Sequence, residues 1–323
     1  MGNGARVLDP VVVERAQGCL MGQLAGDALG SQVEFQSKKQ ILQRYPNGIR
    51  TITDGGTWNT LAGQPTDDSE MALALARTLV QQDRFDSGQV KKAYLRWFES
   101  KPFDCGNTVA RGLSGRVNAQ SQANGALMRI SPLGIFGTRY ELKDVANFAQ
   151  ADARLTHPHI LCLQANALFT MALCSAIAVK HQPEELFRKM KGWAESMGAV
   201  EDLHHIFTRV ESEPPADYIT DQGWVVTAFH NALWQLLTAR NFEEACVHTV
   251  MQGGDTDTNA AICGALMGAV HGLEAIPLQW RNAVLNCRPS KLNSRVEHPR
   301  PEIYWPVDAL ELAVLLLGGK PSV

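Results

Sequence analysis

The stretch GGDTDTNAAICGALMGAVHG, residues 253–272, places two aspartates one residue apart, after a glycine pair and before a run of small apolar residues. Two carboxylates that close repel each other unless a cation, a proton or a helix terminus compensates their charge. The Ala- and Gly-rich run that follows is typical of a helix that packs closely at the centre of a domain. The remaining sequence must therefore indicate what compensates Asp255 and Asp257.

Helical periodicity dominates the rest of the chain. Apolar residues recur at i, i+3 and i+4, and runs of alternating β-branched residues are absent, so we predict an all-α fold. The predicted helices cover residues 11–29, 68–82, 87–100, 141–155, 159–179, 183–197, 224–239, 241–252, 258–273, 277–286 and 306–317.

The composition predicts one large domain. The chain has 323 residues, 45% hydrophobic and 20% charged, with no linker, repeat or low-complexity tract. We expect the domain to span residues 15–323, preceded by an N-terminal arm of residues 1–14. The formal net charge of -3 and the lack of Lys/Arg-rich stretches argue against nucleic acid or an anionic membrane as partner.

The cysteines and the N-terminus indicate a cytoplasmic location. The seven cysteines are dispersed and form no CxxC pair, which argues against a disulfide framework and a zinc site. The first residues lack the basic start and long apolar core of a signal peptide. Residues 161–179 form the most apolar long segment, but Gln164 and Asn166 interrupt it, so we expect a buried helix.

A second acidic cluster, Thr66, Asp67 and Asp68, opens another predicted helix. Thr and Asp are favoured at helix N-termini, so simple capping accounts for one such cluster. Two clusters with the same layout offer more anionic oxygen than capping requires, and such oxygens suit hard divalent cations. We therefore predict metal ligands.

Neither an EF-hand loop nor a phosphotransferase motif fits DTDTN. An EF-hand loop counted from Asp255 would need Gly and Glu where Ala260 and Leu266 stand. A phosphotransferase with an Asp-x-Asp nucleophile would place that motif after an apolar strand, whereas a glycine pair precedes it here.

Further stretches carry polar groups suited to a ligand. Asp27 and Glu34 flank a glycine turn after the first predicted helix. Residues 105–115 and 124–137 are predicted to be glycine-bearing loops whose backbone N–H groups cradle phosphates.

With these stretches the chain resembles the ADP-ribosylglycohydrolase family from about residue 15 to about residue 275. The motifs occur in the family's order: GDALGSQVE, TDDSEMAL, GNTVARGL, NGALMRISPLG, THPH and GGDTDTNAAICGALMGA. The resemblance implies a single large orthogonal helical domain with a two-metal centre that holds two Mg²⁺ or Mn²⁺ ions. The implied metal ligands are Thr66, Asp67, Asp68, Asp255, Asp257 and Thr258.

The resemblance also implies roles for more residues. The implied contacts to ADP-ribose are Asn124, Gly125, Ala126, Met128 and His157, and the implied catalytic residues are Glu34, Asp104, Asp67 and Asp257. Residue type alone leaves two alternatives open. His157 also suits a helix start, and Arg129 suits either a phosphate contact or a buried salt bridge.

The expected activity is metal-dependent removal of ADP-ribose from modified protein side chains. Asp104 stands two residues before the Gly-Asn-Thr motif that begins at Gly106. This arrangement is similar to that of the arginine-specific branch of the family, so arginine is the expected linkage. The alternative is a protein that binds ADP-ribose or neutralises an ADP-ribosylating toxin, with or without turnover.

Overall fold

The computed structural model describes residues 8–319, and these form helices joined by turns and loops, without a strand. The all-α prediction is therefore confirmed. Two 3₁₀ turns, Leu273–Ala275 and Glu302–Tyr304, accompany the α-helices. The α-helices are α1 (Pro10–Gly30), α2 (Lys38–Arg44), α3 (Asp67–Gln82), α4 (Ser87–Glu99), α5 (Asn107–Leu113), α6 (Ser131–Gly137), α7 (Leu142–Arg154), α8 (Ile160–Ala178), α9 (Pro183–Ser196), α10 (Glu201–Arg209), α11 (Val225–Thr238), α12 (Phe242–Val250), α13 (Thr256–His271), α14 (Leu278–Asn286) and α15 (Ala309–Leu316).

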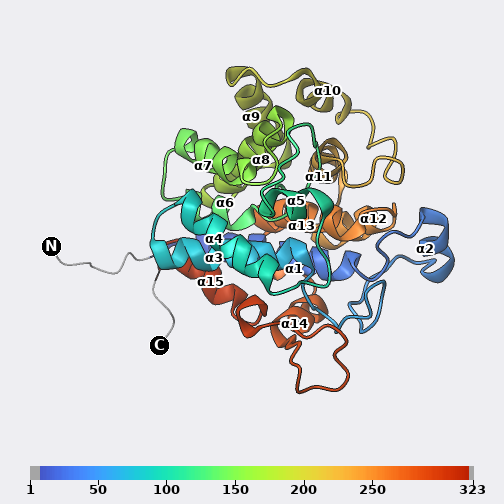
Figure 1. Cartoon of the computed structure of the whole chain (residues 1–323). Helices are drawn as coiled ribbons and strands as arrows, with labels where there is room; N and C mark the ends of the chain where they lie inside the picture. Colours follow the sequence, from blue (N-terminus) through green and yellow to red (C-terminus); the bar gives the residue numbers. More distant parts are fainter. Residues whose placement is uncertain (1–7, 320–323) are drawn as a thin grey trace.

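Helices α1 and α13 lie side by side in the middle of the molecule, with α9 and α10 at the top and α14 and α15 at the bottom of the view (Figure 1). Glycine allows their backbones to touch. A Cβ at Gly22 would collide with the carbonyl oxygen of Gly264, and a Cβ at Gly26 would collide with that of Ala260. Small residues at four-residue spacing thus define the contact between the two helices.

The most apolar helix, α8, is long and apolar enough to cross a membrane by length and composition, with a mean hydropathy of 1.8. However, 89% of its most apolar 18-residue stretch is buried within the structure, and the helix packs against α6, α7 and α13 among others. Helix α8 therefore serves as a core helix, as the sequence predicts.

Two segments predicted as loops contain helices. Residues 107–113 form α5 and residues 131–137 form α6. The glycines in these segments serve close packing: a Cβ at Gly112 would lie 2.8 Å from the Cα of Thr156, and a Cβ at Gly134 would lie 2.6 Å from the Cβ of Leu173. The loop prediction was wrong there because glycine signals close approach as well as turns.

The first helix begins inside the stretch expected to be an arm. Pro10 occupies the first turn of α1, and the carboxylate of the N-cap Asp9 accepts a hydrogen bond of 2.9 Å from the backbone N–H of Val11. Residues 1–7 of the expected arm lie outside the described residues.

The contact between α1 and α13 gives a testable expectation for stability. We expect Gly22→Ala to lower the free energy of unfolding by roughly 1–3 kcal/mol, because the added methyl group overpacks the helix contact. Gly192→Ala is the matched control, since Gly192 lies in α9 with open space around its Cβ position, and it should stabilise by roughly 0.5–1 kcal/mol. Urea denaturation of both variants measures the difference, and equal stabilities would contradict this packing argument.

Candidate active site

The N-termini of α3 and α13 meet at the carboxylate of Asp68. Its Oδ2 accepts a hydrogen bond from the hydroxyl of Thr258 at 3.2 Å and lies 3.3 Å from the hydroxyl oxygen of Thr66. Its Oδ1 is buried and has no hydrogen-bond partner among the described residues. Because a buried carboxylate oxygen without a partner is costly, this atom is suited to a cation.

Capping does not account for either acidic cluster. Thr66 and Asp255 occupy the N-cap positions of α3 and α13, but neither side chain caps its helix. The hydroxyl of Thr66 instead donates to Asp27 at 2.9 Å, and its backbone N–H donates to the same carboxylate at 3.1 Å. The side chains at the two N-cap positions therefore bond to other residues and do not cap their helices.

A further set of carboxylates lies close by. One oxygen each of Glu34, Asp104 and Asp257 lies within 4.8 Å of the others. Glu34 is fixed by Trp58, whose indole N–H donates to Oε2 at 2.6 Å. The sequence distances between these residues are large, so only the fold brings the group together.

Burial raises the pKa values of these carboxyl groups above their ordinary values, with the charge of neighbouring carboxylates adding to the effect. The pKa rises to about 6 for Asp67, about 7 for Asp27, about 8 for Glu34 and about 10 for Asp104, and it rises well above the ordinary value for Asp68 and Asp257. Such a cluster holds protons near neutral pH or balances its charge with a cation. The oxygen-only donor set fits hard divalent ions.

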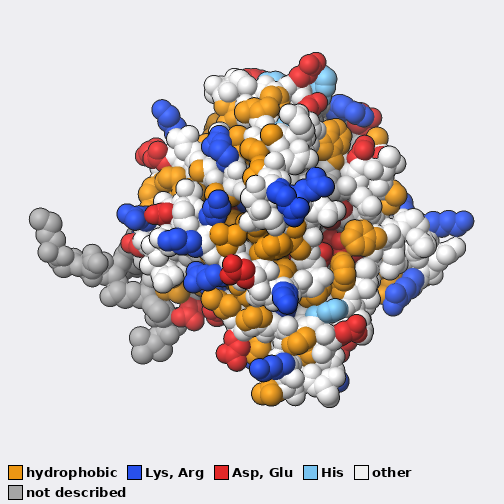
Figure 2. All heavy atoms as spheres, in the orientation of Figure 1, with side chains coloured by type: hydrophobic (Ala, Val, Ile, Leu, Met, Phe, Trp, Pro, Cys, Tyr) orange, Lys and Arg blue, Asp and Glu red, His pale blue; other side chains and the backbone are white. Residues whose placement is uncertain are grey.

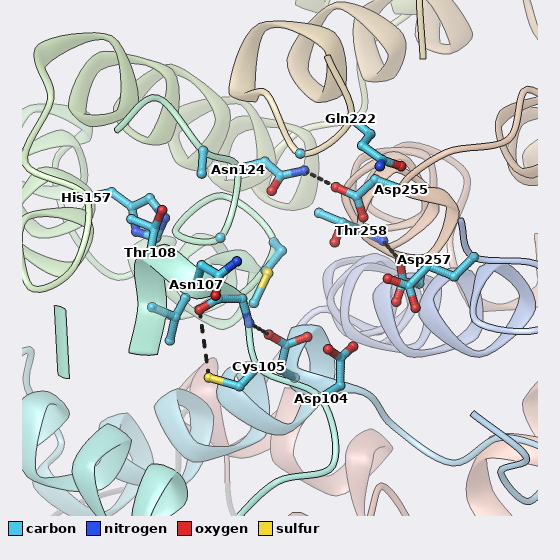
Figure 3. A pocket seen from close by; sticks show the side chains of 18 of the residues that line it. Asp104, Cys105, Asn107, Thr108, Asn124, His157, Gln222, Asp255, Asp257 and Thr258 are labelled. Atoms are coloured by element: carbon cyan, nitrogen blue, oxygen red, sulfur yellow. Dashed lines mark hydrogen bonds between the residues drawn. The ribbon is translucent and has the colours of Figure 1, made fainter. Parts of the chain in front are cut away.

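A cavity of about 370 Å³ adjoins the carboxylates. Asp104, Asp255 and Asp257 lie on one side of it, and His157 and Thr108 lie on the other (Figure 3). Its lining includes, among the predicted site residues, Glu34, Asp67, Asp104, Asn124, Gly125, Met128, His157, Asp255, Asp257 and Thr258.

Three predicted site residues do not line the cavity. Thr66 and Asp68 are buried beside the cavity. Asp68 accepts a hydrogen bond from Thr258, which lines the cavity. Ala126 is fully buried in a small apolar cluster with Ala153 and Leu163. The side chain of Ala126 therefore packs into the core, and the contact of this residue with a ligand stays a prediction for its backbone.

Hydrogen bonds tie Asn124 and Gly106 to the acidic side of the cavity. The amide of Asn124 donates to Oδ2 of Asp255 at 2.7 Å, and the backbone N–H of Gly106 donates to Oδ2 of Asp67 at 3.0 Å (Figure 3). The backbone N–H of Asn124 donates to the carbonyl oxygen of Gly223 at 2.9 Å. The positions of Asp255 and Asp67 thus depend on the neighbouring loops.

Arg129 is a structural residue. It is fully buried, and its Nε donates to Asp152 at 3.0 Å. Of the two alternatives that the sequence leaves open, the buried salt bridge is the one present.

A second buried ion pair supports the segment that leads to Asp104, and sequence reasoning missed it. Arg300 Nε lies 2.7 Å from Oε1 of Glu70 on α3, and its Nη1 donates to the carbonyl oxygen of Ser100 at 3.0 Å. Ser100 is the C-cap residue that follows α4, and Asp104 lies four residues later. No spacing signal reveals this contact, because 230 residues separate Arg300 from Glu70.

Basic side chains are spread singly over the face shown in Figure 2, mixed with acidic and apolar ones. This distribution offers no extended basic surface on that face of the described residues.

The chain is similar to proteins of one family over nearly its whole length. The family described as ADP-ribosylglycohydrolase matches residues 8–304. A Rhodospirillum rubrum protein named ADP-ribosyl-dinitrogen reductase glycohydrolase is 33% identical over 311 residues, covering 93% of this chain and 97% of that protein. A Pseudomonas putida protein named ADP-ribosylarginine hydrolase Tri1 is 28% identical, covering 83% of this chain and 73% of that protein.

The similarity extends to a more distant relative and to a solved structure. The human ADP-ribosylhydrolase ARH3 is 24% identical, covering 84% of this chain and 89% of that protein. A solved structure titled ADP-ribosylglycohydrolase-related protein complex is 28% identical with a TM-score of 0.76, covering 95% of this chain and 98% of that chain.

The acidic cluster predicts how metal ions and pH affect stability. Because folding raises the pKa of these carboxyl groups, the metal-free native state binds more protons than the unfolded state, and its stability falls as pH rises from about 4 to about 8. A divalent ion at 100 times its dissociation constant adds about 2.7 kcal/mol. We expect Mg²⁺ or Mn²⁺ to raise Tm of EDTA-treated protein, and to raise it more at higher pH. Identical Tm values with and without metal would contradict a metal site.

Asp257→Asn separates metal binding from capping. The substitution keeps the side-chain volume and removes one charge, so the metal-free variant should be more stable than the parent near neutral pH and should lose the rise in Tm with metal. Asp9→Asn is the matched control at a true N-cap, where Asn also caps well, and its metal response should be unchanged. An Asp257→Asn variant with the full metal response would favour a structural role for Asp257.

Proposed function

This chain belongs to the ADP-ribosylglycohydrolase family, and from that premise we propose that it removes ADP-ribose from modified arginine side chains of proteins. It is a hydrolase, as its relatives are by name. The observation that carries the arginine proposal is the position of Asp104, which lines the cavity with an oxygen within 4.8 Å of oxygens of Glu34 and Asp257.

The charge of the leaving group supports arginine. A guanidinium is cationic and presents a planar fork of N–H donors, which a carboxylate can accept and orient. Asp104 is half-buried beside other carboxylates, which raise the cost of leaving it ionised without a positive partner. When ADP-ribose is linked to serine, the leaving group is the neutral serine hydroxyl, which supplies no positive charge.

The donor set at the helix N-termini fits a pair of divalent ions, which we propose to be Mg²⁺ or Mn²⁺. The residues that would hold them are Thr66, Asp67, Asp68, Asp255, Asp257 and Thr258, and the unpartnered Oδ1 of Asp68 is the observation that favours a cation there. When bound, divalent ions supply positive charge that offsets carboxylate repulsion and stabilises charge developing on the reacting sugar.

The side chains supply binding, orientation and proton transfer. Hydrolysis breaks the bond between the anomeric carbon and the guanidinium nitrogen and joins that carbon to a water oxygen, while one water proton ends on the leaving nitrogen. Glu34, whose pKa is raised to about 8 by burial, is suited to hold or pass that proton near neutral pH. Trp58 fixes its orientation through Oε2.

Sequestration of a toxin gains no support from the comparisons, which name enzymes acting on ADP-ribosylated substrates. Every metal ligand that the family resemblance implies is also present in the sequence. We therefore retain hydrolysis as the proposed function.

Paired substrates test the linkage. Asp104→Ala should lower the rate on arginine-linked ADP-ribose on the order of a hundredfold, the typical contribution of a positioned acid–base group. Binding of free ADP-ribose should persist, because Asn124, Gly125 and His157 lie elsewhere in the cavity. Release of ADP-ribose from arginine- and serine-linked peptides, assayed side by side, measures both. Faster release from serine, or an unaffected variant, would reject arginine and leave the family assignment intact.

A further inference from the structure

A buried hydrogen-bond network lies beside the cavity and is not used in the proposed reaction. At its base, Tyr94 donates to Oδ1 of Asp152 at 2.8 Å, and Arg129 donates from Nε to Oδ2 at 3.0 Å. The guanidinium carbon of Arg129 also lies 4.5 Å from the centre of the Tyr94 ring. The guanidinium is therefore fixed in position by contacts on several sides.

The Arg129 guanidinium determines the role of the Thr156 hydroxyl. Arg129 Nη1 donates to Thr156 Oγ1 at 3.0 Å, so this oxygen acts as an acceptor toward Arg129. A hydroxyl has one hydrogen to donate. Among the described residues, the one remaining hydrogen-bond partner of Thr156 Oγ1 is Nδ1 of His157, at 2.7 Å. Because arginine has no acceptor, the hydroxyl hydrogen is left for His157.

The hydrogen bonds of Thr156 determine which nitrogen of the His157 ring carries the proton. Burial, together with the charge of Arg129, lowers the pKa of His157 to about 3, so the ring is neutral. If Nδ1 accepts the hydrogen of Thr156, then the single ring proton resides on Nε2. The tautomer follows from the direction of the hydrogen bonds rather than from the ring alone.

The second ring nitrogen is available to a ligand. Nε2 of His157 is buried and has no hydrogen-bond partner among the described residues, and His157 lines the cavity. Gly125 leaves it accessible, since a Cβ at that position would lie 3.2 Å from Nε2. Figure 3 shows His157 on the side of the cavity opposite Asp257. A buried N–H without a partner is costly, so a ligand acceptor would satisfy it.

We propose that Thr156 is a positioning residue, which holds His157 as the neutral tautomer protonated at Nε2 and so presents a fixed N–H donor to an acceptor oxygen of bound ADP-ribose. The identity of the ligand rests on the proposed function, whereas the tautomer does not. Because the ring is neutral, the His157 N–H selects an acceptor atom of the ligand by hydrogen-bond direction rather than by charge.

The tautomer is tested directly in the ligand-free protein. Long-range ¹H–¹⁵N correlation spectra distinguish a protonated from an unprotonated ring nitrogen, and the His157 signals are identified by their loss in His157→Gln. We expect Nε2 to be protonated and Nδ1 unprotonated in the parent protein and in Thr156→Ser, which retains the hydroxyl. Protonation of Nδ1 in the parent protein would overturn the proposal whatever the enzymatic activity.

Binding tests the consequence for the ligand. Thr156→Val keeps the shape of the side chain but removes the hydrogen offered to Nδ1, so we expect the affinity for ADP-ribose, measured by calorimetry, to fall about tenfold, as for one hydrogen bond to a charged acceptor. Thr156→Ser should stay within about twofold of the parent, because it restores the same hydrogen bond. Unchanged affinity in Thr156→Val, or an equal loss in Thr156→Ser, would assign Thr156 to packing and overturn the proposal.

The tautomer and affinity measurements test the role of Thr156, whereas the assay on arginine- and serine-linked substrates tests the proposed function. A protein with the expected tautomer and ADP-ribose affinity that fails to release ADP-ribose from arginine would contradict the proposed function alone. An active hydrolase with Nδ1 protonated would contradict the role of Thr156 alone.

Discussion

The direct backbone contact between α1 and α13 is the constraint on which the site depends. With glycine at positions such as Gly22 and Gly264, the two helices approach until backbone meets backbone. The same contact continues to the helix ends, where the hydroxyl of Thr256 donates to the carbonyl oxygen of Gly30. This places the turn that carries Glu34 against the N-terminus of α13, so the positions of Glu34, Asp255 and Asp257 follow from the packing of two apolar helices.

The buried carboxylates of the site repel one another, and this repulsion opposes the packing that brings them together. Burial raises the pKa of several carboxyl groups at once, because each loses water and gains like-charged neighbours. A protein selected only for stability would not gather them. The hydroxyl of Thr258 donates to Oδ2 of Asp68, while Oδ1 has no hydrogen-bond partner among the described residues and is suited to a cation.

Local patterns in the sequence predict the helices well, because apolar spacing reflects which face each helix buries, as in α3 and α13. They fail at α5 and α6, where glycine allows close packing and does not mark a loop. Motif resemblance names ten of the nineteen residues that line the cavity, whereas the side chain of Ala126 packs into the core. The Arg300–Glu70 pair cannot be predicted from spacing, since the fold alone joins them.

The distance along the chain between α1 and α13 has a consequence for biosynthesis. Thr256 and Gly30, which bond in the finished protein, are 226 residues apart, so at ordinary translation rates roughly 11–45 s separate their synthesis. During that interval α1, which is buried on nearly every side in the native state, has no partner for its glycine face. In a nascent chain, α1 therefore lacks its α13 partner until late in translation.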